Sequence, residues 1–262
     1  MKKVKKYFKV WWLMSRNSFV SVLYQKMSFL IFLIGKVLRF GFFTLFLVFL
    51  VKGTGVVAGY TVEQSILFFL TFNLIDIIGQ FLFREVYRFR PLIVTGDFDL
   101  ILVKPVSALF RVLMGGADFI DLVTIPPLII AIYFVGKTLN PGFADIALFL
   151  LLTVSGLIIA ASFHIIVLAF GILTLEIDHM IMIYRDILSL GRLPVDIYRE
   201  PIKSVITYLV PVGIMITFPA KAMMGLVRPM GVLISLVMGI LLFGFSLKFW
   251  NFALKRYTSA SS

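Results

Sequence analysis

Residues 144–175 read ADIALFLLLTVSGLIIAASFHIIVLAFGILTL, an apolar run in which Asp145 and His164 are the only titratable side chains. About 20 apolar residues suffice for an α-helix to cross a bilayer. The rest of the chain has the same character, because 61% of its 262 residues are hydrophobic, 28 are Phe and only 15% are charged. Backbone polar groups in lipid must be satisfied internally, and long apolar runs favour helices over a β-barrel. We therefore predict an all-α, polytopic membrane helical bundle.

Five other runs are long enough to be spans. With residues 144–175 they give six predicted transmembrane helices, at 27–51, 63–83, 110–135, 144–175, 202–218 and 232–252. The first run contains Lys36 and Arg39, and the fifth contains Pro211, so these two are the least regular. The sequence leaves open whether Pro211 and Pro219 kink the fifth span or frame a re-entrant turn. An even number of spans places both termini on one side.

The basic residues predict which side that is. Nineteen lie in the N-terminal arm, in the loops after the second and fourth spans and at the C-terminal end, whereas the other face has only Lys52, Lys137, Lys221 and Arg228. Lys and Arg near span ends collect in the cytoplasm. We therefore predict a multi-pass protein of the cytoplasmic membrane with both termini cytoplasmic. Basic loops beside anionic membrane lipids also account for the net charge of +12, so no nucleic-acid partner is expected.

Residues 1–26 form a separate N-terminal unit. Val4, Phe8, Trp11 and Trp12 recur near helical spacing, and lysines occupy the positions between them. This pattern predicts an amphipathic helix lying in the membrane interface, where tryptophan anchors well. A cleavable signal peptide is disfavoured, because no small-residue cleavage site follows a short apolar core.

Several polar residues fall within the predicted spans. The intramembrane polar set comprises Lys36, Arg39, Asp76, Asp118, Asp121 and His164, with Asn73 and Gln80 beside Asp76 on the second span. Buried charges usually pair, so we favour ion pairs that hold helices in register over a polar pathway or hinge. His164 stands alone on its span and is expected to be a hydrogen-bonded packing residue rather than a metal ligand.

The sequence offers no catalytic motif. It has no cysteine, no nucleotide-binding phosphate loop, no HExxH and no GxSxG. Glu176, Asp178 and His179 do not share one helical face, so we predict no metal site there. We expect no catalytic residue and no cofactor in this chain, and infer that energy for any work comes from a partner.

Residues 84–111, REVYRFRPLIVTGDFDLILVKPVSALFR, form a charged segment between the second and third runs. Pro91 is expected to stop the second span, and Thr95, Gly96 and Asp97 offer turn and capping chemistry for a short helix. A short helix bounded by Gly and Pro is what a motor subunit needs in order to push on a membrane domain. An ordinary hairpin is the simpler interpretation.

A family resemblance favours the first interpretation. Residues 86–90 (VYRFR), 96–100 (GDFDL) and 102–105 (LVKP) resemble the first cytoplasmic loop of ABC-2 type transporter permeases with six spans. Residues 193–198 (LPVDIY) and 218–220 (FPA) are similar to later features of that branch. Lys104 stands where arginine is commoner in the family, which keeps the charge but weakens bidentate pairing.

The resemblance implies a domain at 27–262 that acts as the permease subunit of an ATP-binding cassette transporter. Its partners would be an ABC ATP-binding subunit, which holds ATP and Mg, and a second permease in a homodimer or heterodimer. The ATPase-coupling loop at 84–109 would use Arg88, Arg90, Gly96, Asp97, Asp99, Lys104 and Pro105. A second cytoplasmic loop at 176–201 would make another contact. The family suggests export of an amphipathic drug, lipid or glycan.

Two other functional classes remain. An ion-coupled secondary transporter would use Asp76, Asp118 and His164, although the two halves of the chain show no clear inverted repeat. A membrane-integral lipid-modifying enzyme would use the intramembrane carboxylates, although they form no clustered motif.

Overall fold

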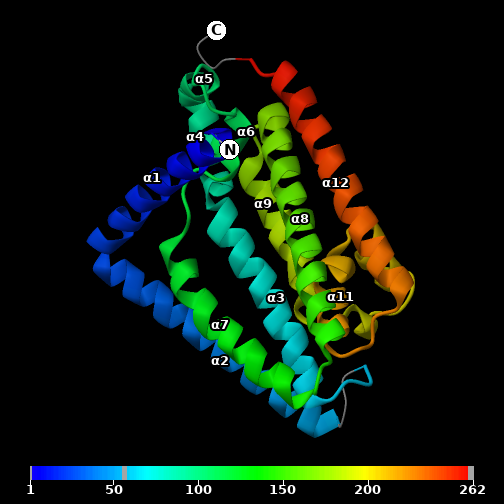
Figure 1. Cartoon of the computed structure of the whole chain (residues 1–262). Helices are drawn as coiled ribbons and strands as arrows, with labels where there is room; N and C mark the ends of the chain where they lie inside the picture. Colours follow the sequence, from blue (N-terminus) through cyan, green and yellow to red (C-terminus); the bar gives the residue numbers. More distant parts are fainter. Residues whose placement is uncertain (1, 55–57, 259–262) are drawn as a thin grey trace.

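The computed structural model describes residues 2–54 and 58–258 and consists of helices (Figure 1). The first two helices are α1 (Lys2–Tyr24) and α2 (Lys26–Thr54), which meet at Gln25 and form an open V beside the rest of the molecule. Most side chains of α2 are exposed, which is expected of a helix that faces lipid or another membrane subunit.

Helix α3 (Val62–Phe83) lies at the centre of the bundle, and most of its residues are buried. Its first turn is fixed by a capping box, in which the Thr61 hydroxyl accepts from the Gln64 amide and the Gln64 side chain accepts from the Thr61 amide. Helices α7 (Phe119–Thr138) and α8 (Phe143–Thr174) pack against α3, and α12 (Pro229–Lys255) packs against α8 on the side away from α3 (Figure 1).

Helices α8 and α12 pack closely through small residues. The Ser155 hydroxyl donates to the carbonyl oxygen of Ser235 at 2.9 Å. A Cβ atom on Gly239 would lie only 3.1 Å from the Ser155 hydroxyl oxygen. Small residues allow this approach, and membrane helices associate in this way because lipid provides no hydrophobic drive between them.

Beyond α3 the chain forms a compact cap of short helices. These are η1 (Arg84–Arg88), α4 (Phe89–Val94), α5 (Asp97–Leu102) and α6 (Ala108–Leu113). The expectation that Pro91 stops the second span was wrong, because Pro91 lies in the first turn of α4, where a missing amide is tolerated. The third span starts at Phe119 rather than at residue 110, because residues 114–118 are not helical.

The segment at 176–201 does not stay at one end of the bundle. Helix α9 (Ile177–Ser189) runs back beside α8, followed by η2 (Leu190–Arg192) and η3 (Val195–Ile197). Asp178 lies at the α4–α6 end, 3.5 Å from Arg90. Asp196 lies at the opposite end, where it accepts a hydrogen bond from Tyr60, just before α3. The expected single loop is therefore divided between the two ends.

The predicted fifth span is broken. It consists of α10 (Ile202–Ser204), η4 (Val205–Leu209), η5 (Gly213–Thr217) and α11 (Phe218–Met223). Its two halves, 202–209 and 213–223, meet at 75° across Pro211. Proline supplies no amide donor, and both flanking turns are π-helical. Within the described ranges, five helices are long and apolar enough to span a membrane, and this bent pair would be the sixth.

Candidate functional site

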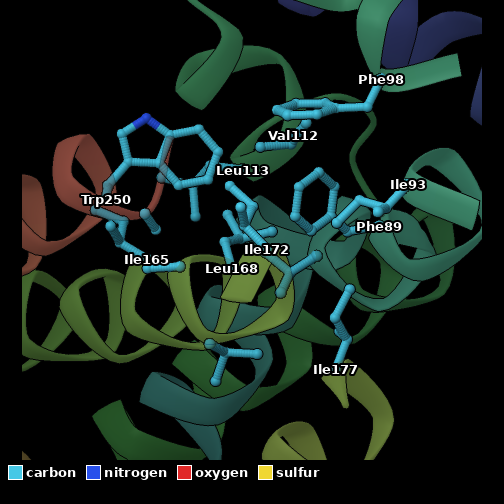
Figure 2. Close-up of a cluster of buried hydrophobic side chains, with 14 of the residues drawn as sticks. Phe89, Ile93, Phe98, Val112, Leu113, Ile165, Leu168, Ile172, Ile177 and Trp250 are labelled. Carbon is cyan, nitrogen blue, oxygen red and sulfur yellow. The ribbon is translucent and has the colours of Figure 1, made fainter. Parts of the chain in front are cut away.

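The α4–α6 cap is anchored to the bundle through a buried aromatic and aliphatic cluster (Figure 2). Phe98 of α5 makes edge contacts with Phe89 of α4 at 5.1 Å and with Trp250 of α12 at 6.4 Å, measured between ring centroids. Leu168 of α8 and Ile177 of α9 belong to the same cluster. We call it the anchor cluster. It packs the cap against α8, α9 and α12.

The outer side of the cap carries exposed apolar side chains. Val103 is 80% exposed, Leu100 60% and Val94 58%. We call these three residues the apolar crest. Exposed apolar side chains at the tip of a rigid element, beyond the membrane-spanning helices, are typical of a surface that contacts another protein.

The predicted coupling residues in the turn before α5 fix the direction of that helix. Gly96 adopts a left-handed conformation with φ of 79°, which glycine reaches without strain. The Thr95 hydroxyl donates to the Asp97 carboxylate at 2.7 Å. Asp97 and Asp99 both lie in the first turn of α5, where a carboxylate is favoured by the helix dipole. Burial, with a contribution from Asp99, raises the pKa of Tyr257.

The remaining predicted coupling residues lie around the rim of the cap. Arg88 is 3.6 Å from Glu85, and Arg90 is 3.5 Å from Asp178 at the start of α9. Both pairs are largely exposed on the arginine side, so each contributes little to stability. Lys104 and Pro105 are exposed in the turn after α5. The structure thus gathers the predicted coupling residues in the cap and brings Asp178 to them.

Helix α1 lies along the segment that leads from the cap to α7. The Lys6 ammonium donates to the carbonyl oxygen of Pro105 at 2.6 Å, and the Tyr7 hydroxyl accepts from the Ser107 amide at 3.1 Å. The buried Ser15 hydroxyl accepts from the Ala117 amide at 3.2 Å. The N-terminal helix expected from the sequence is present, and it holds residues 105–117 along their length.

An ion pair behind the cap was missed by the sequence analysis. Glu85 is buried and lies 2.7 Å from the guanidinium of Arg111, which links η1 to α6. A Cβ atom on Gly115 would lie 1.9 Å from the Arg111 guanidinium and 2.4 Å from its carbonyl oxygen. The signal in the sequence was an acidic residue inside a basic segment, followed by a Gly-Gly pair.

Some residues of the intramembrane polar set make ion pairs in the structure. Lys36 of α2 forms an ion pair with the buried Asp121 of α7. Asp118 caps α7 by accepting from the Ile120 amide at 2.8 Å, and it lies 3.3 Å from Arg84. Arg39 makes no ion pair within the ranges that the structure describes. Lys36, Arg39, Asp118 and Asp121 line one cavity of about 620 Å³.

Asp76 and His164 do not line that cavity. The His164 ring is buried, its Nδ1 lies 2.8 Å from the carbonyl oxygen of Ala160, and Phe83 and Tyr184 pack against it. Its other ring nitrogen, Nε2, is buried without a hydrogen-bond partner among the described residues.

The end of the bundle opposite the cap has a cluster centred on Asp196. Its carboxylate lies 2.9 Å from the Lys203 ammonium and 2.6 Å from that of Lys221, and it accepts from the Tyr60 hydroxyl at 2.9 Å. Partial burial on its own would raise the pKa of Asp196, but the hydrogen bonds from Lys203, Lys221 and Tyr60 outweigh it and lower that pKa to about 2. The carboxylate therefore ties the broken span to the segment before α3.

Comparison with family models identifies the family of the chain. The model described as ABC-2 family transporter protein matches residues 36–261, which is most of the chain. The chain belongs to this family. No curated protein and no solved structure gives a significant match. Membership of the ABC-2 family, together with the long apolar helices, makes the chain a multi-pass membrane protein and the permease type of subunit.

The matched region contains the cap, the anchor cluster, the Glu85–Arg111 pair and the Asp196 cluster. It begins within α2, so α1 lies outside it. The ABC-2 family features that the sequence resembled, at 86–105, 193–198 and 218–220, all lie inside the match.

Proposed function

We propose that this chain is the permease subunit of an ATP-binding cassette exporter, and that it moves an amphipathic drug, lipid or glycan across the cytoplasmic membrane. A separate subunit binds ATP and Mg and hydrolyses the nucleotide. The chain pairs with itself or with a related permease, and both termini face the cytoplasm. The α4–α6 cap then points toward the ATPase.

The observation that carries this proposal is that the cap has the exposed apolar crest on one side and contributes to the buried anchor cluster on the other. Leu100 of α5 and Val103, directly after α5, are exposed, whereas Phe98 and Ile101 of α5 are buried. A surface that is exposed and also packed tightly against α8 and α12 is suited to transmit a movement of a bound partner to these helices.

The predicted coupling residues have distinct roles in this proposal. Gly96 and Asp97 set the direction of α5, and Asp99, Lys104 and Pro105 border the crest. Arg90 connects α4 to α9 through Asp178, and Arg88 lies beside Glu85 within η1. Closure of the ATPase dimer on ATP would move the cap, and the connected helices would switch the permease between inward and outward access.

Helix α1 fits a position in the cytoplasmic membrane interface. Its outer side carries exposed Val4, Phe8 and Trp12, and its inner side contacts residues 105–117. An amphipathic helix with lysines and tryptophan at this boundary binds headgroups while holding the cap segment in place.

Co-purification tests the proposal directly. The tagged full-length protein, extracted in mild detergent from its native membrane, should bring with it a stoichiometric ATP-binding subunit that mass spectrometry can identify. Val103→Glu should reduce the amount recovered on the order of tenfold or more, because it buries a charge in an apolar contact. Charge reversal at Asp97 and Lys104 should also weaken recovery.

Leu226→Glu is the matched control, because Leu226 is half exposed at the end opposite the cap. It should leave the recovered subunit unchanged. If no ATP-binding subunit is recovered in detergent or in native lipid, the exporter proposal is wrong. Transport that continues without ATP and stops in Asp118→Asn would instead establish an ion-coupled carrier.

A further inference from the structure

The cavity that Lys36 and Arg39 line lies between α2 on one side and α3 and α7 on the other. It has a volume of about 620 Å³ and also reaches Arg185 of α9. Most side chains of α2 are exposed, so the cavity borders a surface that faces away from the bundle. A lipid-like molecule could therefore reach it from the membrane without passing through the bundle core.

The lining of this cavity is strongly basic. Five basic side chains, Lys36, Arg39, Arg84, Arg88 and Arg185, face two acidic ones, Asp118 and Asp121. Lys36 and Arg84 pair with these two carboxylates, and Arg88 lies beside Glu85. Arg39 and Arg185 make no ion pair within residues 2–54 and 58–258, although Arg185 makes a hydrogen bond with the Tyr87 side chain. After these pairs are counted, the net charge of the cavity lining is positive, and it is carried by guanidinium groups.

The tendency of basic residues to lie at the cytoplasmic ends of spans does not explain the position of Arg39. It lies well inside α2, at about 20 Å along the helix axis from Lys26 at a rise of 1.5 Å per residue. A cation at this depth is costly unless a counter-charge accompanies it. Arginine forms bidentate hydrogen bonds with phosphate and carboxylate groups. An anion between Arg39 and Arg185 would therefore supply Arg39 with a counter-charge and Arg185 with acceptors for the donors that Tyr87 does not use.

An apolar slot adjoins this basic cavity. It has a volume of about 250 Å³ and shares Lys36 and Arg39 with the larger cavity. Its other walls include Phe40, Ile77 and Leu128. A basic chamber that continues into an apolar slot matches a molecule with an anionic head and a hydrocarbon tail.

We propose that the basic cavity and its apolar slot bind an amphiphile with a phosphate headgroup, the phosphate on Arg39 and Arg185 and the hydrocarbon chain along Phe40 and Leu128. That this amphiphile is the molecule the exporter transports rests on the proposed function. The binding itself needs no ATPase, so it can be measured on the permease alone.

Native mass spectrometry of the purified full-length chain in a neutral detergent tests the binding. Phosphatidic acid and phosphatidylcholine with identical acyl chains are titrated separately, and wild type should bind the phosphatidic acid on the order of tenfold more tightly, because only that headgroup is a monoester anion. Arg39→Gln and Arg185→Gln should each weaken phosphatidic acid binding by a similar factor. Arg199→Gln, an exposed arginine that does not line either cavity, should bind as wild type.

Equal binding of the two lipids by wild type would overturn the proposal without any variant being needed. Complete displacement by an equal concentration of inorganic phosphate would also overturn it, since the site would then select a small anion rather than an amphiphile. The two proposals fail separately. Loss of the ATP-binding partner leaves phosphatidic acid binding intact, and absence of phosphatidic acid binding leaves co-purification intact.

Discussion

Gly115 decides whether the buried Glu85–Arg111 pair can form. An alanine Cβ there would overlap the Arg111 guanidinium and backbone oxygen, so the turn between α6 and α7 would have to move. We expect Gly115→Ala to lower the free energy of unfolding by about 2–4 kcal/mol, from overpacking and weakening of a buried pair. Scanning fluorimetry in detergent should show a lower melting temperature.

Gly41→Ala is the control, because a Cβ atom on Gly41 of α2 has nothing within 4 Å. Alanine there should leave the melting temperature unchanged or raise it slightly, since glycine costs about 0.5–1 kcal/mol in a helix. A Gly115→Ala variant that melts with the wild type would show that the pair does not restrict this turn.

The Asp196 carboxylate should make stability depend on pH in the acid range. Its pKa is about 2 in the folded protein, against about 3.9 for an unperturbed aspartate. A lowered pKa stabilises the fold above pH 4, and this contribution is lost as the pH falls from about 4 toward 2. Melting temperatures measured from pH 7 to pH 3 should therefore decline at the acid end.

Asp196→Asn should lower the melting temperature at pH 7, because Lys203 and Lys221 lose their shared carboxylate. It should also flatten the acid decline. Asp186→Asn, at an exposed position of α9, should keep the pH dependence of the wild type. If the melting temperature of Asp196→Asn declined with pH as steeply as that of the wild type, Asp196 would not be the source of the acid dependence.

At the scale of elements, α1 stabilises residues 105–117 through hydrogen bonds, and we call these contacts the α1 brace. The double variant Tyr7→Phe and Ser15→Ala removes the acceptors for the Ser107 and Ala117 amides while keeping most of the packing. We expect hydrogen exchange at residues 105–118 to become faster, because those amides lose protection, while α8 exchanges as before. Mass spectrometry of peptides from both regions measures the difference.

Lys9→Ala is the control for the brace, since Lys9 is exposed on the same helix. It should leave exchange at residues 105–118 unchanged. Faster exchange throughout the bundle in the double variant would mean that α1 supports the whole fold rather than this segment.

At the scale of the whole molecule, the cap and the end of α7 lie at opposite ends of the bundle (Figure 1). Lys104 and Lys137 are both exposed lysines at these two ends, and the chain has no cysteine of its own. With both termini cytoplasmic, a membrane-impermeant maleimide should label Lys137→Cys in intact cells and Lys104→Cys only after permeabilisation. The reverse pattern would invert the orientation and place the cap outside.

The sequence by itself determined the class of fold and most span boundaries. The predicted spans at 27–51, 63–83, 144–175 and 232–252 agree with α2, α3, α8 and α12 to within three residues at each end. Apolar runs of this length have to be helical in lipid, so their bounds can be read from composition alone. The short helix after Gly96 was also predictable, because a glycine turn is a local signal, although α5 begins at a left-handed Gly96 without a side-chain cap.

Only the tertiary structure decided how these helices meet. The division of residues 176–201 between two ends and the Glu85–Arg111 pair depend on contacts between segments distant in the sequence. Local pattern leaves such contacts open, because an apolar residue suits lipid and protein neighbours equally well. For the same reason the sequence showed only that Lys36 and Arg39 are charges within a span. The packing of α2, α3 and α7 pairs Lys36 with Asp121. It also places Arg39 in the same cavity, without an ion pair among the described residues.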